Sequence, residues 1–124
     1  MRSLSLKAFV GLLLFDPVVH LVGFGMLHRV VRGWPTAARS APPDAVDRVL
    51  IAVNRACRFY PRKALCLHRS AVSTCLLRSA GVPARMVIGV RKIPFRAHAW
   101  VEVDGVAVNE GVRVREFFQV LETC

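Results

Sequence analysis

Two side chains of this sequence, Cys66 and His98, have the types needed for nucleophilic catalysis. Cys66 opens the stretch CLHRSAVSTCLLRSAG, in which apolar residues recur at the spacing of one helical face. Gly81 and then Pro83 end this pattern, as a C′ glycine and a following proline do. The sequence therefore predicts a helix of about four turns with Cys66 in its first turn. Backbone N–H groups without partners and the positive end of the helix dipole favour a thiolate there.

His98 begins a segment, His98–Val103, whose residues alternate between apolar and polar, and this period predicts a β-strand. A histidine on such a strand can take the proton of a cysteine thiol and later protonate the leaving group. A third polar residue is needed to orient the imidazole. The next predicted strand, Val106–Glu110, offers Asn109 or Glu110 for that role.

The hairpin around Asp104-Gly105 decides which of these two residues faces the histidine. If the loop has two residues, Val103 pairs with Val106, and Asn109 shares the face of His98. The glutamate that follows then points to the other face of the sheet.

A loop of three residues gives the other result. Its last residue favours the left-handed region, which Gly105 adopts without strain. Glu102 then pairs with Val106, and His98 stands opposite Glu110. Side chains directly opposite each other come within about 5.5 Å at Cβ, so an amide or a carboxylate there can hold an imidazole. The residues alone leave both registers open.

Composition indicates one folded domain, residues 1–124, because 54% of the residues are hydrophobic and the mean hydropathy is positive. We expect an apolar helical region over 1–40 and a core over 41–124. The net charge of +10 suits an anionic membrane surface, or an acidic peptide or protein. No basic run alternates with aromatic residues, so we expect no nucleic-acid partner.

Helical periodicity comes first in the chain and strand periodicity last, which predicts an α+β fold with a small antiparallel sheet. A helix begins after Asp44, a good N-cap, and ends before Pro61. The other elements expected are a loop at 33–44, strands at 85–91, 98–103 and 106–110, and a short helix at Arg115–Leu121.

Residues 8–31 are the most apolar stretch and are long enough to cross a bilayer. Asp16-Pro17 interrupts the stretch, and an aspartate in the middle of a membrane is costly. We therefore predict two short buried helices, with Pro17 as the first residue of the second. Peripheral membrane contact, or docking onto a partner, is the alternative for this region.

Four cysteines, Cys57, Cys66, Cys75 and Cys124, form no CxxC pair, and no clear signal peptide precedes them. We therefore expect a reducing, cytoplasmic location. Cys57 and Cys75 lie on predicted apolar stripes and are expected to be core thiols, and Cys124 is expected to be inert. Cys66, His68 and Cys75 make only a weak zinc pattern, so we expect no metal and no cofactor.

Several motifs together resemble one known family. They are CLHRS at 66–70, the following LLRSAGVPARMVIGV, the dipeptide PF, and then HAWVEVDG and VNE. This set, spread over roughly residues 60–112, is similar to the transglutaminase-like cysteine peptidases of lasso peptide biosynthesis, the B2 proteins. The short chain resembles the split form of that family, in which the leader-recognition domain is a separate protein.

The resemblance implies a transglutaminase-like, papain-like fold and a cysteine peptidase that removes the leader peptide from a ribosomally made precursor. It implies Cys66 as the nucleophile and His98 as the base. Glu110 matches the position where the family usually has an aspartate, which favours the three-residue loop, and Asn109 is the second candidate. The partners implied are the precursor peptide, a small leader-recognition protein of the B1 type, and an ATP-dependent lasso cyclase.

Two other functions stay open. A transglutaminase-like acyl transferase would pass the acyl group from Cys66 to an amine instead of water. A non-catalytic scaffold attached to a membrane or a partner would carry a decayed triad. A peptidase without its own recognition domain is expected to be weak alone, with the basic charge and the apolar N-terminal third as its docking surfaces.

Overall fold

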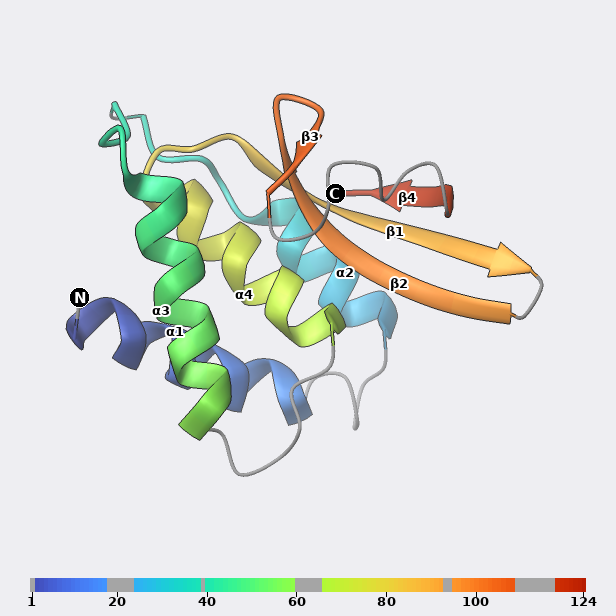
Figure 1. The fold of residues 1–124 in the computed structure, drawn as a ribbon, viewed down its shortest axis with the longest axis horizontal. Coiled ribbons are helices and arrows are strands. Elements are labelled where there is room, and N and C mark those ends of the chain that lie inside the picture. The colour runs from blue at the N-terminus through green and yellow to red at the C-terminus, as the bar shows by residue number, and fades with distance from the viewer. Residues whose placement is uncertain (1, 18–23, 39, 60–65, 93–94, 109–117) are drawn as a thin grey trace.

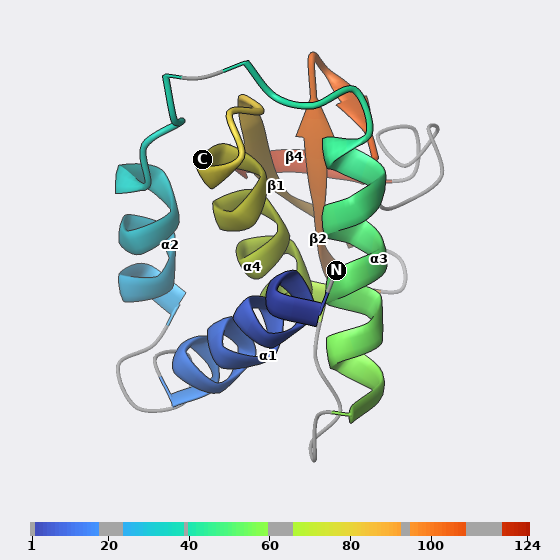
Figure 2. The ribbon, with the colours of Figure 1, turned by 90° about the vertical axis from the view of Figure 1, so that its left-hand side faces the viewer.

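The computed structural model describes residues 2–17, 24–38, 40–59, 66–92, 95–108 and 118–124. They form a layer of helices against one antiparallel sheet (Figure 1, Figure 2). The helices are α1 (Arg2–Pro17), α2 (Phe24–Gly33), α3 (Ala45–Phe59) and α4 (Cys66–Ser79). The strands are β1 (Ala84–Lys92), β2 (Phe95–Val103), β3 (Val106–Ala107) and β4 (Gln119–Thr123). The predicted α+β class is confirmed.

Helix α4 is the centre of the fold, because it contacts α1, α2 and α3 as well as β1 and β2. It ends at a glycine cap, since Gly81 has a φ of 95° in the left-handed region. The N–H of Gly81 donates to the carbonyl of Arg78 at 3.0 Å, and the N–H of Val82 donates to that of Leu77 at 2.9 Å. These are the two hydrogen bonds of a Schellman cap, so the predicted helix and the reason for its end are confirmed.

The sheet turns one side, which we call the near face, toward the helices. Ala84 and Met86 of β1 and Val101 of β2 lie on this face and are at most 1% exposed. They join a single hydrophobic core with buried side chains from every helix. Its helical members include Leu12, Leu27, Val53, Val72 and Leu77.

The opposite side of the sheet, the far face, carries a second and smaller cluster. Val87 and Trp100 are cross-strand partners on this face, and both are 0% exposed. Ala107 completes the buried set, and the partly buried Phe118 and Val120 pack against it. Because side chains alternate along a strand, β1 and β2 contribute to both faces.

The strand order is β3-β2-β1-β4, and the described pairs are all antiparallel. β4 lies along the edge of β1 that β2 leaves free, where Met86 and Cys124 exchange backbone hydrogen bonds of 2.9 and 2.8 Å. The short helix predicted for Arg115–Leu121 is therefore wrong where the structure describes it, from residue 118 on. The free edge of β1 supplies hydrogen-bond partners for the backbone of this segment. The local sequence of the segment does not predict that pairing.

The N-terminal third forms two helices as predicted, but their boundary differs. α1 ends at Pro17, so the prediction that Pro17 opens the second helix is wrong. Ala8 and Leu12 lie one turn apart and are 0% exposed, and the helix that buries them includes Pro17 as its last described residue. The other side of α1 is exposed, with Leu14 at 64%. None of the described helices is both long enough and apolar enough to cross a membrane.

The helix predicted after Asp44 is α3, whose Arg48 N–H donates to the Asp44 carbonyl at 3.0 Å. Its stripe is confirmed, because Val49 and Val53 are 2% exposed. The chain between α2 and α3 is the predicted loop where it is described. The Nε1 of Trp34 in this loop donates to the Ser79 hydroxyl at the end of α4, at 3.0 Å.

Arg78 is a buried cation that joins three segments. Its Nε donates to the carbonyl of Ala84, at the start of β1, at 2.8 Å. One terminal nitrogen donates to the carbonyls of Val31 in α2 and Trp34 in the loop, the latter at 3.2 Å. The guanidinium therefore satisfies carbonyls from the helix layer and from the sheet with one planar group.

The hairpin between β2 and β3 corrects the predicted loop. Val103 pairs with Val106, so Asp104 and Gly105 alone form the loop, and the three-residue register is wrong. Their φ values of 54° and 78° are both positive, as a type I′ turn requires. Aspartate tolerates this conformation, and the twist of a type I′ turn matches that of the flanking strands.

Candidate active site

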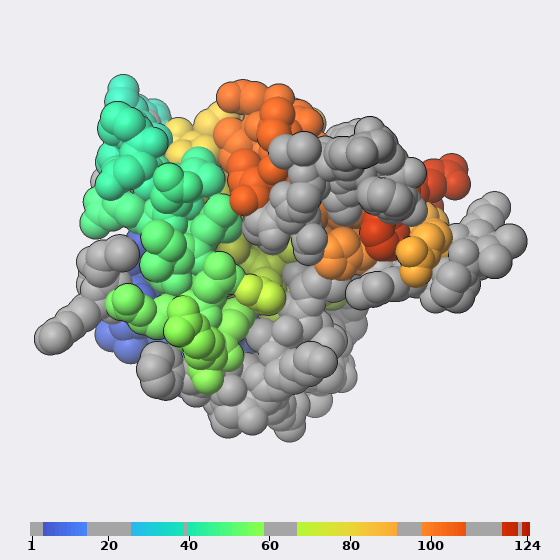
Figure 3. Space-filling view, in the orientation of Figure 1, coloured from blue at the N-terminus to red at the C-terminus, as the bar shows by residue number. Residues whose placement is uncertain are grey.

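Cys66 is the first residue of α4, which agrees with the predicted helix start. The beginning of α4 lies beside β2 in both ribbon views, and the two elements are in contact (Figure 1, Figure 2). Figure 3 shows the yellow-green first part of α4 reaching the surface between α3 and the strands. The side chain of Cys66 lies outside the described residues. Cys66 is the first described residue of α4, and in the first turn of a helix the N–H groups have no intrahelical partners and the dipole is positive.

The first turn of α4 is held against α3 by polar contact and burial. Arg69 donates a hydrogen bond from a terminal nitrogen to Oδ1 of Asn54 on α3. Ser70, the next residue, is 0% exposed. The turn of α4 that follows Cys66 is therefore anchored on α3 and in the core.

The pKa values of two other cysteines argue against them as nucleophiles. Burial raises the pKa of Cys75 to about 12, and smaller effects of Arg78 and Cys124 lower and raise it, respectively. Burial also raises the pKa of Cys57, against the opposing effect of the Arg69 guanidinium. A thiol that stays protonated is a weak nucleophile. The prediction that Cys75 is a core thiol is confirmed by its 4% exposure.

His98 lies on the far face of β2, directly opposite Gly89 of β1. It is half-buried, and the centroid of its ring is 5.4 Å from that of Phe118 and 6.1 Å from that of Trp100. The body of α4 packs on the near face. The described side chains therefore do not fix a contact between Cys66 and the imidazole, and that contact stays a prediction.

Trp100 and Glu102 extend the far-face group along β2. Trp100 is 0% exposed, and its Nε1 donates to Oε2 of Glu102 at 2.8 Å. Glu102 is itself only 5% exposed. Glu102 had no predicted role, although the period of two in HAWVEV places it on the face of His98.

The candidates for the third catalytic residue, Asn109 and Glu110, lie outside the described residues. The described pairing of β2 with β3 bears on these two residues only indirectly, through the face of the sheet that it predicts for each. Val103 opposite Val106 is the pairing under which the sequence argument puts Asn109 on the face of His98.

A metal site was the weakest of the chemical alternatives. Within the described part of the chain, no three histidine, cysteine or acidic side chains gather to hold an ion. His68 is 4% exposed in α4, and Cys75 holds its proton because burial raises its pKa to about 12. A thiol must lose its proton to bind zinc, so Cys75 is poorly suited to the role.

The sequence profile of the Transglutaminase-like superfamily matches residues 11–123. The chain belongs to this superfamily, which confirms the transglutaminase-like character drawn from the motifs. Over 59 residues, it is 39% identical to the microcin J25-processing protein McjB of Escherichia coli. The matched stretch is 48% of this chain and 28% of that protein, so little more than a quarter of the relative is covered. No solved structure matches the chain.

Proposed function

We propose that this protein is a cysteine peptidase that removes the leader peptide from a lasso peptide precursor. The observation that carries the proposal is a cysteine at the first residue of α4, beside the strand that bears His98, in a transglutaminase-like chain. The partial identity with a microcin-processing protein supports a peptide substrate. A reducing cytoplasm is the compartment that keeps such a thiol free.

The proposed reaction begins when the Cys66 thiolate attacks the carbonyl carbon between leader and core. A C–S bond forms, the amide C–N bond breaks, and the His98 imidazolium gives its proton to the leaving amine. Water, deprotonated by His98, then hydrolyses the thioester and leaves a free leader carboxylate and the thiol. The backbone N–H of Cys66 is a natural first donor for the oxyanion at the start of α4.

Glu110 and Asn109 are the two candidates for the orienting residue: the family resemblance favours Glu110, whereas the two-residue hairpin favours Asn109. A carboxylate accepts a hydrogen bond from the imidazole N–H, and its negative charge also stabilises the imidazolium. An amide oxygen accepts the same hydrogen bond without carrying a charge. Replacing each with alanine distinguishes them by kcat for precursor cleavage. The orienting residue is expected to cost on the order of 10²-fold or more, and the other substitution about twofold or less.

Mass spectrometry of a leader-containing precursor incubated with the protein tests the peptidase. The wild type is expected to release a leader with a new free carboxylate, and Cys66→Ala to release none. Cys57→Ala is the matched control, because this thiol is half-buried on α3, and it is expected to cleave normally. A leader joined to an amine would indicate acyl transfer. If Cys66→Ala and the wild type process the precursor equally, the non-catalytic scaffold is the function that remains.

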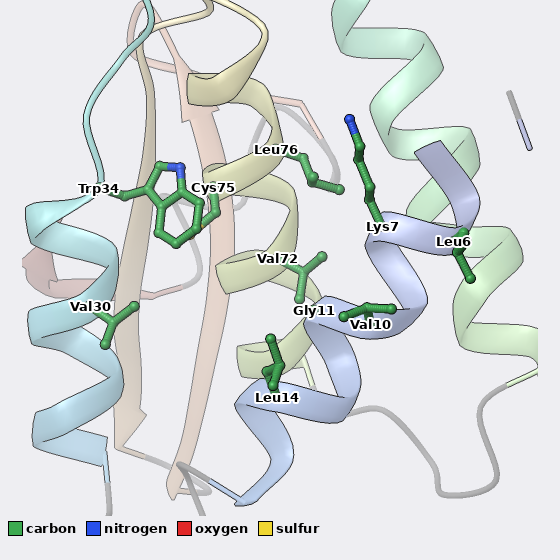
Figure 4. A pocket seen from close by; sticks show the side chains of 10 residues that line it. All are labelled: Leu6, Lys7, Val10, Gly11, Leu14, Val30, Trp34, Val72, Cys75 and Leu76. Carbon is green, nitrogen blue, oxygen red and sulfur yellow. The ribbon is translucent and has the colours of Figure 1, made fainter. Parts of the chain in front are cut away.

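The proposal includes a docking surface for a separate leader-recognition protein. An apolar groove of about 480 Å³ runs between α1 and α2, with α4 as its floor (Figure 4). Figure 4 shows Val10 and Leu14 on the α1 side and Trp34 on the α2 side, with Val72 and Cys75 on α4 between them.

Exposure and charge favour an apolar and acidic polypeptide as the occupant. Leu14 is 64% exposed at the wall of the groove, whereas Val72 at its floor is 2% exposed. A side chain that protrudes from a protein partner therefore fits the groove better than a flat membrane surface does. Lys7 also lines the groove and offers a partner for a carboxylate. Val72 follows Cys66 by six positions on α4, about 9 Å along the axis, so a partner bound here can present the leader close to the thiol.

Leu14→Asp tests this surface with the purified leader-recognition protein. The variant is expected to raise the Kd at least about tenfold while the protein stays folded, because the side chain is exposed. Ile51→Asp is the matched control, since Ile51 is 48% exposed on α3, away from the groove. Equal binding by both variants would contradict the docking surface. Loss of binding to anionic vesicles instead would point to a membrane, and full cleavage by the isolated chain would contradict the need for a partner.

A further inference from the structure

Gly89 of β1 stands opposite His98 at a place where no other side chain fits. A Cβ built on Gly89 lies 2.8 Å from Cη2 and 2.9 Å from Cζ3 of Trp100. It also lies 2.9 Å from Cβ of Phe118. Contacts this short are repulsive, so an added side chain forces the Trp100 ring and Cβ of Phe118, or the backbone of β1, to shift. The glycine is required here by the close approach of neighbours and not by its backbone conformation.

The Trp100 indole is held at both of its ends. Its six-membered ring rests on Gly89, and its Nε1 donates to Glu102 at 2.8 Å. The indole is 0% exposed, and Glu102, whose carboxylate accepts this hydrogen bond, is only 5% exposed. A ring held at two points keeps one orientation, so the edge of the indole that makes neither contact also has a fixed position.

His98 occupies the space beside this indole. Its ring centroid is 6.1 Å from Trp100 and 5.4 Å from Phe118, with interplanar angles of 32° and 34°. The rings of Trp100 and Phe118 are themselves 6.1 Å apart, so the three rings form a closed group. The Arg91 guanidinium lies 5.8 Å from the centroid of Phe118 and adds a cation–π contact to it. The imidazole is thus bounded by two rings and stays half-buried.

We propose that Gly89 is a positioning residue for His98. Its missing side chain lets Trp100 and Phe118 close beside the imidazole and hold it in one orientation. The catalytic consequence of this inference rests on the proposed function, in which His98 is the base. Gly89 itself touches no reacting atom, so it acts only through the two rings.

The test compares Gly89→Ala with Gly33→Ala in the full chain. Gly33 is the matched control, because a Cβ there meets nothing within 4 Å. Gly89→Ala is expected to lower kcat for precursor cleavage by about tenfold or more while KM changes about twofold or less, since a misplaced base mainly slows the chemical step. Gly33→Ala is expected to change neither. A wild-type kcat in Gly89→Ala would overturn the proposal.

A second substitution tests whether the effect passes through the indole. Phenylalanine at position 100 lacks the atoms Cη2 and Cζ3, so Trp100→Phe removes two of the three short contacts of an added Cβ. The double variant Gly89→Ala/Trp100→Phe is therefore expected to have a higher kcat than Gly89→Ala alone. A double variant no better than the single one would overturn the route through Trp100.

A structural measurement separates this inference from the peptidase proposal. Nuclear Overhauser contacts between the ring protons of His98 and those of Trp100 and Phe118 are expected in the wild type and in Gly33→Ala, and to weaken in Gly89→Ala. Unchanged contacts in Gly89→Ala would overturn the positioning role. Weakened contacts in a protein that cleaves no precursor would uphold it while the peptidase proposal fails. If Gly89→Ala does not fold, Gly89→Ala/Trp100→Phe is compared with Trp100→Phe. Contacts between His98 and Phe118 are expected to be weaker in the double variant, because its added Cβ still meets Cβ of Phe118 at 2.9 Å. Equal contacts in the two variants would overturn the role.

Discussion

The near and far faces of the sheet hold different kinds of side chains. Met86 and Val101 on the near face are aliphatic, 0% exposed, and packed against the helices. The far face holds the half-buried His98, the Trp100–Glu102 pair and the ring of Phe118. The same two strands supply both faces, because their side chains alternate. We infer that the near face supplies most of the stability, whereas the far face holds His98, the proposed base.

The largest expected effect comes from the far face. His98→Ala is expected to lower kcat for precursor cleavage by about 10²- to 10⁴-fold, because the proton transfers lose their carrier. The free energy of unfolding is expected to fall by about 1 kcal/mol, since the half-buried imidazole loses its contacts with two rings. His28→Ala on α2 is the control for histidine loss as such. A stable and fully active His98→Ala protein would break the division between the faces.

The near face is expected to give the opposite result. Met86→Ala removes a side chain that is 0% exposed and leaves a cavity beneath α4, so unfolding in urea should show a loss of about 2–5 kcal/mol. The kcat of the molecules that remain folded is expected to stay near the wild-type value. Leu121→Ala serves as control, because Leu121 is 59% exposed on β4. A selective loss of kcat in Met86→Ala would show that the faces are not separable.

Glu102 sharpens the comparison, because it is a far-face residue expected to affect stability. Glu102→Ala leaves the buried Nε1 of Trp100 without the acceptor at 2.8 Å, which costs about 1–3 kcal/mol. Glu102→Gln keeps an acceptor oxygen and is expected to lose less. Equilibrium unfolding followed by tryptophan fluorescence measures both. Equal losses in the two variants would mean that the hydrogen bond to Trp100 contributes little.

The effect that is smallest at neutral pH is a pH dependence of stability, which arises in the helical core and appears only at alkaline pH. Burial raises the pKa of Cys75 from 9.0 to about 12, so the folded protein keeps this proton to higher pH than the unfolded chain. The stabilisation is complete below pH 9 and is lost as pH rises toward 12, with a slope of about 1.4 kcal/mol per pH unit. The difference in unfolding free energy between the wild type and Cys75→Ala should therefore shrink over this range. A constant difference would mean that Cys75 ionises normally in the folded state.

Local signals predicted the helical half of the candidate site. The apolar spacing after Cys66 and the glycine at 81 specify α4, because a helix start and a glycine cap depend on neighbouring residues. The alternation in HAWVEV likewise placed His98 on a strand. Whether these two side chains meet depends on tertiary packing, and it stays a prediction.

The errors have physical causes that differ from one another. The tail was predicted as a helix because its pairing partner, the free edge of β1, is distant in sequence. The three-residue hairpin was chosen on a family resemblance, against an Asp-Gly pair that favours a two-residue type I′ turn. Pro17 is predicted to start the second helix, but it lies in α1, whose extent depends on buried contacts earlier in that helix.

Arg78 has a consequence for how the molecule opens. One guanidinium binds carbonyls of α2, of the loop that follows it and of β1, so it joins positions 31 and 34 to position 84. Releasing any of these segments leaves a buried cation with unmet donors, so none of them is free to detach by itself. The helix layer and the sheet are thereby linked into one cooperative unit, whose slowest-exchanging amides should include those around this residue.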